Sequence, residues 1–211
     1  MQLYANPLAC SLASHISLIE SGQAFDLHWV DLKAQRTADG RDYRAINPKG
    51  MVPALSLDEG YTLTENVAVL LAIADRAAPG QLAPAAGTGA RDQVLELLSF
   101  IATELHARVL GPWLTAKSTP LPAEAYAAHL AELLRPRLDY LEAQLEGEDS
   151  YLAGPRFTVA DAYLVPMLTW VRHLRVRLDD WPKLAALYTR LQSRPSVQRA
   201  MKIELQQYRP G

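Results

Sequence analysis

NPKGMVPALSLDEGYTLTENVA, residues 47–68, contains the signals that decide the fold. Two short apolar runs, at 54–55 and 61–63, flank a turn that contains Gly60, and this spacing predicts a β-hairpin. Asn66 precedes the apolar run 67–71, so we expect it to cap the N-terminus of a helix that ends near Ala78. The stretch therefore predicts two strands followed by one helix.

The same stretch offers a place for an extended, amino-acid-like ligand. Pro53 has no N–H to donate, so it marks a strand edge or a special turn, such as one with a cis bond. An extended ligand could pair with the outward backbone of Val52 in the manner of an added strand. The helix start at Glu65-Asn66 offers N–H groups to a carboxylate, while the Glu65 side chain suits an ammonium group. These groups fit an amino acid or γ-glutamyl head group; the alternative is ordinary turn chemistry.

This stretch resembles the glutathione site of the thioredoxin-fold glutathione transferases. The resemblance implies that Val52-Pro53 is the cis-proline element and that Glu65-Asn66 holds the γ-glutamyl end of glutathione. It also implies the fold class, which is an α/β thioredoxin-like N-terminal domain (residues 1–79) followed by an all-α helical-bundle C-terminal domain (residues 88–211). The family segments NPKGMVPAL, TENVA, ATELH and FTVADAY follow in the family's order, with a few-residue insertion around 111–122.

Composition is that of an ordinary globular protein. The chain has 211 residues, of which 49% are apolar and 21% charged, and a net charge of -2 gives no argument for nucleic acid or an anionic membrane as partner. The N-terminus lacks the pattern of a signal peptide and no window is apolar enough to span a membrane, so we expect a cytoplasmic protein. A single cysteine, Cys10, excludes an internal disulfide and a Cys-rich metal site, and we expect no metal.

The first thirty residues predict a strand, a helix and a parallel strand. The run 2–5 ends at Asn6-Pro7, SLASHISLIES places apolar residues on one helical face, and a second run covers 27–30. Residues 31–46 are polar and predict a loop with a helical turn near Asp42. The Pro-, Gly- and Ala-rich run 79–89 predicts an interdomain linker.

Leucine periodicity predicts two long neighbouring helices after the linker, in the regions 95–109 and 130–145. We expect Gly111-Pro112 and the run 120–122 to break the chain between them. Thr158 and Asp161 have the spacing of a capping box, which predicts a helix from there through Trp170. Arg194-Pro195 predicts a boundary between two shorter helices.

Cys10 precedes a predicted helix, whose N-terminus would stabilise a thiolate and lower the thiol pKa; the alternative is a small buried hydrophobe. The segment ACSLASHISLIESG resembles the start of the bacterial beta-class glutathione transferases, and this resemblance identifies Cys10 with the class's characteristic cysteine. Cys10 then either contacts the glutathione sulfur or forms a mixed disulfide with glutathione, and both roles stay open. Ser11 is a second candidate for the sulfur contact; its alternative is a plain N-cap serine.

The segment IATELH resembles the beta-class pattern and implies that His106 faces the glutathione sulfur, with Thr103 and Glu104 near the ligand. A histidine there can donate to a thiolate or titrate near neutral pH, although a helical histidine in isolation is more often structural. Two positions depart from the family: Gln35 stands where a lysine reaches the glycyl carboxylate, and Ser99 stands where an asparagine is usual. Both remain in the expected glutathione-binding set, and the other histidines are expected to be structural or at the surface.

The resemblance implies a detoxifying transferase that joins the glutathione thiolate to small apolar electrophiles, with peroxide reduction as a second mode. Glutathione would be its co-substrate, and family members are homodimers. The apolar side of the electrophile site is expected at Val109, Leu110, Trp113 and Trp170; the alternative is that these residues only pack the core. Two alternatives remain: a one-cysteine thiol-disulfide transferase, and a non-enzymatic protein that binds apolar ligands on the same fold.

Overall fold

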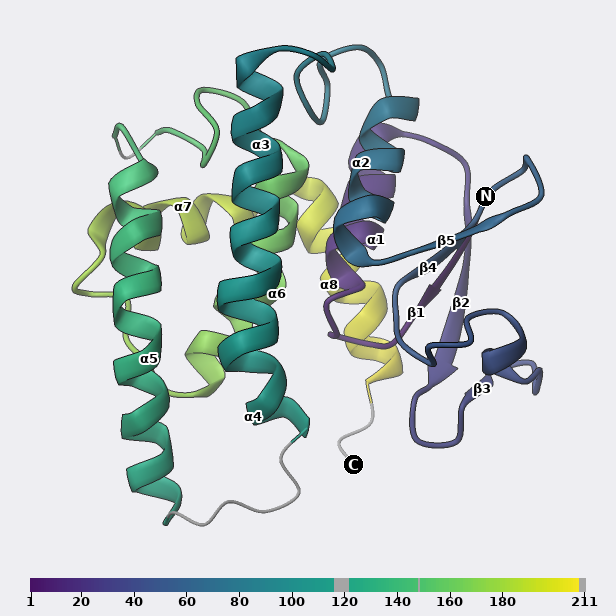
Figure 1. The fold of residues 1–211 in the computed structure, drawn as a ribbon, viewed down its shortest axis with the longest axis horizontal. Coiled ribbons are helices and arrows are strands. Elements are labelled where there is room, and N and C mark those ends of the chain that lie inside the picture. The colour runs from purple at the N-terminus through teal and green to yellow at the C-terminus, as the bar shows by residue number, and fades with distance from the viewer. Residues whose placement is uncertain (116–121, 148, 209–211) are drawn as a thin grey trace.

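The computed structural model of the chain describes residues 1–115, 122–147 and 149–208 (Figure 1). Its N-terminal half contains β1 (Gln2–Ala5), α1 (Leu12–Ser21), β2 (Asp26–Asp31), β3 (Arg36–Thr37), the 3-10 helix η1 (Tyr43–Ala45), β4 (Ala54–Ser56), β5 (Thr62–Thr64) and α2 (Asn66–Arg76). Its second half contains α3 (Gly89–Phe100), the π-helix η2 (Ile101–Leu110), α4 (Gly111–Thr115), α5 (Ala123–Gln144), α6 (Val159–His173), α7 (Pro182–Ser193) and α8 (Pro195–Gln207).

One five-stranded sheet, in the order β3-β2-β1-β4-β5, forms the N-terminal half. β1 and β2 are parallel and are joined through α1, whereas β4 and β5 form the predicted antiparallel hairpin. Leu3 in β1 is paired with Leu27 on one side and Leu55 on the other, which places apolar residues in line across the sheet. The predicted strand and helix order is confirmed, and the two-residue strand β3 is the element that the sequence did not indicate.

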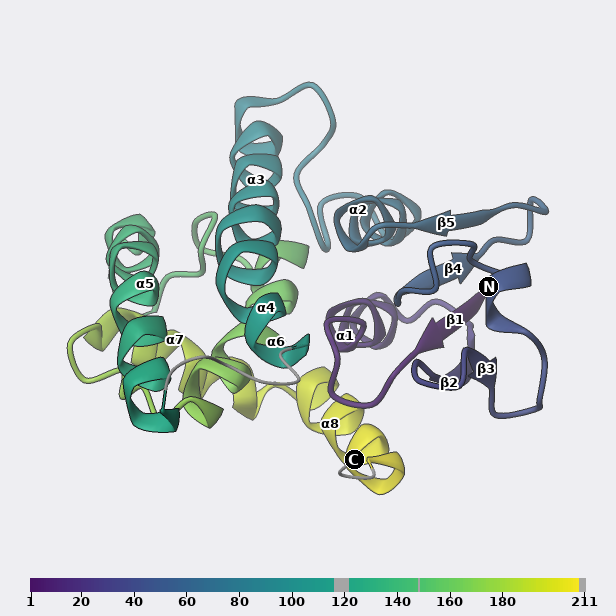
Figure 2. The same ribbon diagram turned by 60° about the horizontal axis from the view of Figure 1, so that its bottom comes forward.

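Helices α1 and α2 lie on the same face of the sheet, between the strands and the helical half (Figures 1 and 2). α1 packs against α6 and also against α8, the last helix, which returns to the N-terminal half. One hydrophobic cluster runs through both halves, and a smaller one around Tyr4 and Tyr43 lies apart from it. The two halves therefore share one hydrophobic core.

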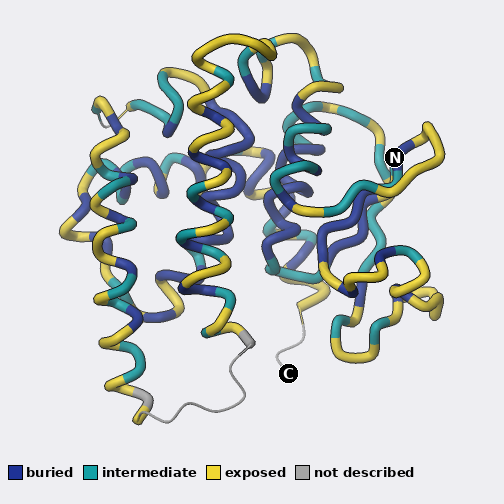
Figure 3. The backbone as a smooth tube through the Cα atoms, viewed as in Figure 1, coloured by how far each residue is buried: buried dark blue, intermediate teal, exposed yellow. Residues whose placement is uncertain are grey.

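The helix α6 is the most deeply buried long element, as its mostly dark trace shows (Figure 3). It begins at the predicted capping box: the Thr158 hydroxyl accepts from the Ala160 N–H, and the Asp161 carboxylate accepts from the Thr158 N–H at 2.8 Å. The second Asp161 oxygen accepts from the N–H of Leu152 at 3.0 Å, so the box also fixes the preceding loop. α6 thus starts at a defined point and ends at His173.

The first long helix does not break at Gly111-Pro112, as the sequence led us to expect. Its central part, η2, is π-helical, and the Gly111 N–H donates to the carbonyl of His106, five residues back. A Cβ on Gly111 would lie 2.9 Å from that carbonyl oxygen, so glycine permits the close approach of two turns and lets α4 follow without a break. The expected break at 120–122 falls largely outside the described residues.

No regular element occupies the described residues 77–88, which agrees with a connecting segment. Leu82 is nevertheless buried, and its carbonyl accepts from the N–H of Val159 at 2.9 Å, so the segment is fastened to the start of α6. The domain ranges 1–79 and 88–211 stay a prediction. Among the described residues, no helix has the length and apolar character needed to cross a membrane.

Candidate functional site

A large cavity of about 1090 Å³ opens between the sheet half and the helical half. Ligand pockets commonly measure about 300–1,000 Å³, so this one has room for more than one small molecule. The N-terminal half contributes loop and strand-end residues: Asn6, Pro7, Leu8, Ala9, Cys10, Leu32, Asn47, Lys49, Met51, Val52, Pro53, Thr64, Glu65, Asn66 and Val67. The helical half contributes Ala102, His106, Ala107, Gly111, Pro112, Trp113, Leu114, Tyr163, Thr169, Trp170, His173 and Tyr208.

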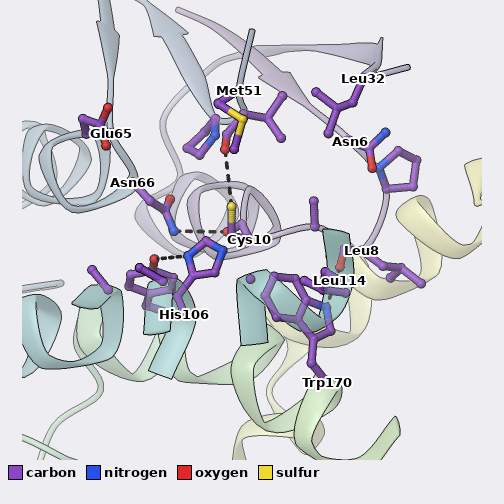
Figure 4. A pocket seen from close by; sticks show the side chains of 18 of the residues that line it. Asn6, Leu8, Cys10, Leu32, Met51, Glu65, Asn66, His106, Leu114 and Trp170 are labelled. Atoms are coloured by element: carbon purple, nitrogen blue, oxygen red, sulfur yellow. Dashed lines mark hydrogen bonds between the residues drawn. The ribbon is translucent and has the colours of Figure 1, made fainter. Parts of the chain in front are cut away.

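The thiol of Cys10 lies at the inner wall of this cavity, two residues before α1 (Figure 4). Its S–H donates to the carbonyl of Val52 at 3.3 Å, and the Val52-Pro53 peptide is cis. Burial raises the pKa of this thiol to about 12, although the backbone N–H groups of Cys10 and Ser11 act in the opposite direction. The expected lowered pKa is therefore wrong, because burial outweighs the helix N-terminus. Cys10 is a thiol at neutral pH and acts as a hydrogen-bond donor.

The N-terminus of α2 presents Glu65 and Asn66 to the cavity. Helix α2 begins at Asn66 and the cap position belongs to Glu65, so the predicted N-cap is displaced by one residue. Glu65 has a φ of 71°, a left-handed value that is uncommon outside glycine and that occurs preferentially at functional positions. Its exposed carboxylate forms an ion pair with the ammonium group of Lys49.

Asn66 is buried and connects α2 to the loop that carries Cys10 (Figure 4). Its amide nitrogen donates to the Cys10 carbonyl at 3.2 Å, and its amide oxygen accepts from the Ser14 hydroxyl at 2.9 Å. Since a carbonyl can only accept, these two contacts fix the orientation of the amide. Asn66 therefore holds the backbone of Cys10 against α1 and α2.

His106 approaches Cys10 from the other half of the protein. The π-helix η2 places Ala102, His106 and Ala107 on the cavity wall, and Figure 4 shows the imidazole turned toward Cys10. Its Nδ1 atom lies 2.8 Å from the hydroxyl of Tyr163, which is buried on α6. Burial lowers the pKa of His106, so the imidazole is neutral at neutral pH. π-Helical segments often occur at functional sites, and here the segment carries the one histidine that faces the thiol.

Two predicted binding residues lie away from the cavity wall in the N-terminal half. The Ser11 side chain is fully buried, and its hydroxyl both donates to the carbonyl of Asn6 and accepts from its N–H, each at 3.2 Å. Ser11 thus fixes the turn before α1. Gln35 has a φ of 54°, and its amide donates to the carbonyls of Leu32 and Gly50, which ties two loops together.

Three further predicted residues lie on α3 and η2, also away from the cavity wall. The hydroxyl of Ser99 donates to Leu95, and that of Thr103 donates to Ser99, both along the helix. The Glu104 carboxylate pairs with Arg108 and with Arg137, and the bond to Arg108 is the largest factor that lowers its pKa. The predicted roles of these residues toward glutathione stay a prediction.

The apolar wall differs in part from the expected one. Trp113 and Trp170 line the cavity, but Val109 and Leu110 are buried and belong to the hydrophobic core. Sequence reasoning missed several wall residues that have no motif and come from distant elements: Leu8, Leu32, Met51, Leu114, Tyr163, His173 and Tyr208. Within the described part of the chain, no group of three or more His, Cys, Asp or Glu side chains could hold a metal ion.

A thioredoxin-like sheet, a helical second half and a thiol-lined cavity between them define a glutathione-transferase-like protein. Comparison with known proteins agrees: residues 9–76 and 105–195 match the family models described as glutathione S-transferase, N-terminal domain and C-terminal domain. The chain belongs to the glutathione S-transferase family, and its expected fold class and enzyme class, a transferase, are confirmed.

Individual relatives cover the whole length of the chain. It is 41% identical over 204 residues to the glutathione S-transferase GstA of Escherichia coli, an alignment that spans 97% of this chain and 98% of the relative. A sphingomonad glutathione S-transferase solved in complex with glutathione is 41% identical, with a TM-score of 0.87 over 97% of this chain and 98% of the other. A beta-class enzyme of Sphingomonas chungbukensis is 40% identical, with the same TM-score and coverage, which agrees with the beta-class resemblance.

Proposed function

We propose that the protein conjugates the sulfur of glutathione to small apolar electrophiles. The observation that carries this proposal is the division of one cavity into two kinds of wall. Cys10, Val52, Glu65 and His106 supply polar groups on one side, whereas Trp113 and the neighbouring apolar residues form the other. The cavity volume of about 1090 Å³ accommodates the tripeptide together with a second molecule.

In this proposal, glutathione lies extended along Val52. An amide N–H of glutathione donates to the Val52 carbonyl, which accepts from the Cys10 S–H in the structure. The Cys10 S–H then donates to the glutathione sulfur instead. The ammonium group of the ligand replaces Lys49 at the carboxylate of Glu65, and the ligand carboxylate meets the N-terminus of α2. Two donors, Cys10 and His106, then stabilise the glutathione thiolate and lower its pKa.

The reaction is a substitution at an electrophilic carbon. The sulfur supplies the electron pair of the new S–C bond, the bond to the leaving group breaks, and the leaving group departs with its electrons. The thiol proton passes to solvent before the attack. In the peroxide mode, two glutathione molecules reduce one hydroperoxide to an alcohol and water and are themselves oxidised to the disulfide.

The test is glutathione-dependent conjugation of chlorodinitrobenzene by wild type and by Cys10→Ala, alongside reduction of a glutathione mixed disulfide by the same proteins. We expect conjugation by wild type and a partial loss in the variant, because His106 remains as a donor. Tight glutathione binding without conjugation would favour a non-enzymatic binding protein. Absence of both binding and conjugation at saturating glutathione would reject the proposal.

The second candidate, a one-cysteine thiol-disulfide transferase, gains less support from the state of Cys10. Thiolates attack disulfides, and the raised pKa of the buried thiol leaves almost none at neutral pH. We therefore expect mixed-disulfide reduction to be slow relative to conjugation. Disulfide reduction that exceeds conjugation and disappears in Cys10→Ala would reverse this order.

Three broader properties of the proposal follow from the family resemblance. We propose that the enzyme works as a homodimer, that it acts in the cytoplasm and that its task is detoxification. The first is testable by light scattering with the purified chain, and the second by fractionation of the source cells.

A further inference from the structure

Tyr163 contacts the side of His106 that faces away from Cys10 (Figure 4), and the role inferred for it rests on the proposed function. The Tyr163 hydroxyl lies 2.8 Å from Nδ1 of His106, with the two rings nearly perpendicular at 87°. Tyr163 is 1% exposed and burial raises its pKa, so the phenol keeps its proton. The imidazole is neutral for the same reason, because burial lowers its pKa.

Two neutral groups can share this hydrogen bond in two ways. If the phenol donates to Nδ1, the imidazole proton sits on Nε2; if Nδ1 donates to the phenol, Nε2 carries a lone pair. The choice decides the chemistry, because Figure 4 shows Nδ1 turned away from the sulfur and the other ring nitrogen on the side of Cys10. Only a protonated Nε2 can donate to a thiolate placed there.

The burial of the Tyr163 hydroxyl decides between the two arrangements. Tyr163 is 1% exposed, and among the described residues the hydrogen-bond partner of its hydroxyl is Nδ1 of His106. If Nδ1 donated, the phenol proton would be left buried without an acceptor, which is unfavourable. Donation therefore runs from the Tyr163 hydroxyl to Nδ1.

We propose that Tyr163 is a positioning residue that fixes the tautomer of His106 with the proton on Nε2, from which His106 donates to the glutathione sulfur. Tyr163 acts through His106 and not on the substrate. The capping box at Thr158 and Asp161 sets the start of α6 at Val159, four residues before Tyr163, which gives this hydroxyl a fixed place. The signal in sequence is no more than a tyrosine after FTVADA.

The first test measures the tautomer without glutathione. In protein with isotope-labelled histidine, we expect nitrogen NMR to find a protonated Nε2 and an unprotonated Nδ1 for the resonance that His106→Asn removes. Tyr163→Phe keeps the ring and should give a mixture of tautomers. Tyr140→Phe, which removes a hydroxyl bonded to Glu96 outside the cavity wall, should leave the signal unchanged. An unprotonated Nε2 in wild type would overturn the proposal.

The second test measures the pKa of the bound glutathione thiol by its thiolate absorbance. We expect Tyr163→Phe to raise this pKa by about one unit, which is a tenfold loss of thiolate below the pKa. The loss in kcat/KM should shrink as the pH rises and thiolate forms unaided. In the His106→Asn background, Tyr163→Phe should add nothing.

The outcomes separate the two proposals. The role of Tyr163 would be overturned if Tyr163→Phe had an additional effect in the His106→Asn background. It would also be overturned if His106→Asn raised the pKa of the bound glutathione thiol and Tyr163→Phe left that pKa unchanged. Failure of wild type to bind glutathione or conjugate it would reject the proposed function instead. The tautomer measurement stands in either case, since it needs no ligand.

Discussion

Replacement of Glu204 by leucine is the perturbation whose magnitude the structure defines best. Glu204 lies on α8, is 0% exposed, and its carboxylate joins two groups of the N-terminal half. One oxygen accepts from the N–H of Leu8 at 2.7 Å, and the other lies 2.9 Å from Nδ1 of His15, which is 1% exposed. Leu8 has a φ of 60°, so the loop at the cavity is held in an uncommon conformation by this contact.

The expected loss follows from the partners left behind. Glu204→Leu leaves the part-buried Leu8 N–H and the buried His15 nitrogen without acceptors, at about 1–3 kcal/mol each. Their sum agrees with the roughly 3–5 kcal/mol lost when one member of a buried pair is removed. At about 2–4 °C per kcal/mol for a chain of this size, Tm should fall by roughly 6–20 °C.

His15→Phe in the same protein supplies the matched test. Phenylalanine keeps a ring against Phe25, whose ring contacts that of His15 edge-on, and it has no polar atom to leave unpaired. The double variant should therefore regain about 1–3 kcal/mol relative to the sum of the single variants. Urea unfolding followed by circular dichroism and tryptophan fluorescence measures these values where the two transitions coincide.

Glu132→Leu, a change of an exposed glutamate on α5, should shift stability by no more than about 0.5 kcal/mol and serves as the control. Additive effects of the His15 and Glu204 variants, or a Glu204→Leu protein as stable as wild type, would refute the reasoning.

Three further changes test other parts of the structure. Glu65→Gln should raise the KM for glutathione about tenfold or more through loss of a charged hydrogen bond, while Glu59→Gln, in an exposed ion pair with Arg76, should leave it unchanged. Burial raises the pKa of Cys10 to about 12, so the folded protein holds the thiol proton more tightly than the unfolded chain does. The free energy of unfolding should therefore fall as the pH rises above about 8.5, where the thiol of the unfolded chain ionises. A pH profile identical to that of Cys10→Ala would contradict this. Thr158→Ala should cost about 1 kcal/mol of stability through loss of the N-cap of α6, which thermal melts would check.

One wall of the cavity could be predicted because its signals are local. Val52, Pro53, Glu65 and Asn66 occupy one short stretch, and the proline and the helix start each have a direct chemical meaning. The capping box at the start of α6 was recognisable for the same reason. Even there, the helix begins one residue earlier than the asparagine suggested, because Glu65, with its positive φ, takes the cap position.

The protonation state of Cys10 could not be predicted from its position before a helix. A helix N-terminus lowers a thiol pKa, but the sequence gives no measure of how deeply the second half buries the sulfur. The same limit applies to Val109 and Leu110, whose apolar side chains suit a cavity wall and a core equally well; both are buried where η2 packs against α5 and α6. In both cases, contact between distant segments decides an outcome that a local pattern leaves open.

The two walls of the cavity are held by contacts with different parts of the protein. Val52 and Glu65 are held by contacts within the N-terminal half, with the Cys10 thiol and with Lys49. Leu8 is held from the helical half, between the carboxylate of Glu204 and the indole N–H of Trp170, which donates to its carbonyl at 3.1 Å. Substitutions on α6 and α8, including ones that never touch the cavity, should therefore move the wall around Leu8 and leave the wall around Val52 and Glu65 in place. Under the proposed function, Glu204→Leu should accordingly change the KM for the electrophile more than the KM for glutathione.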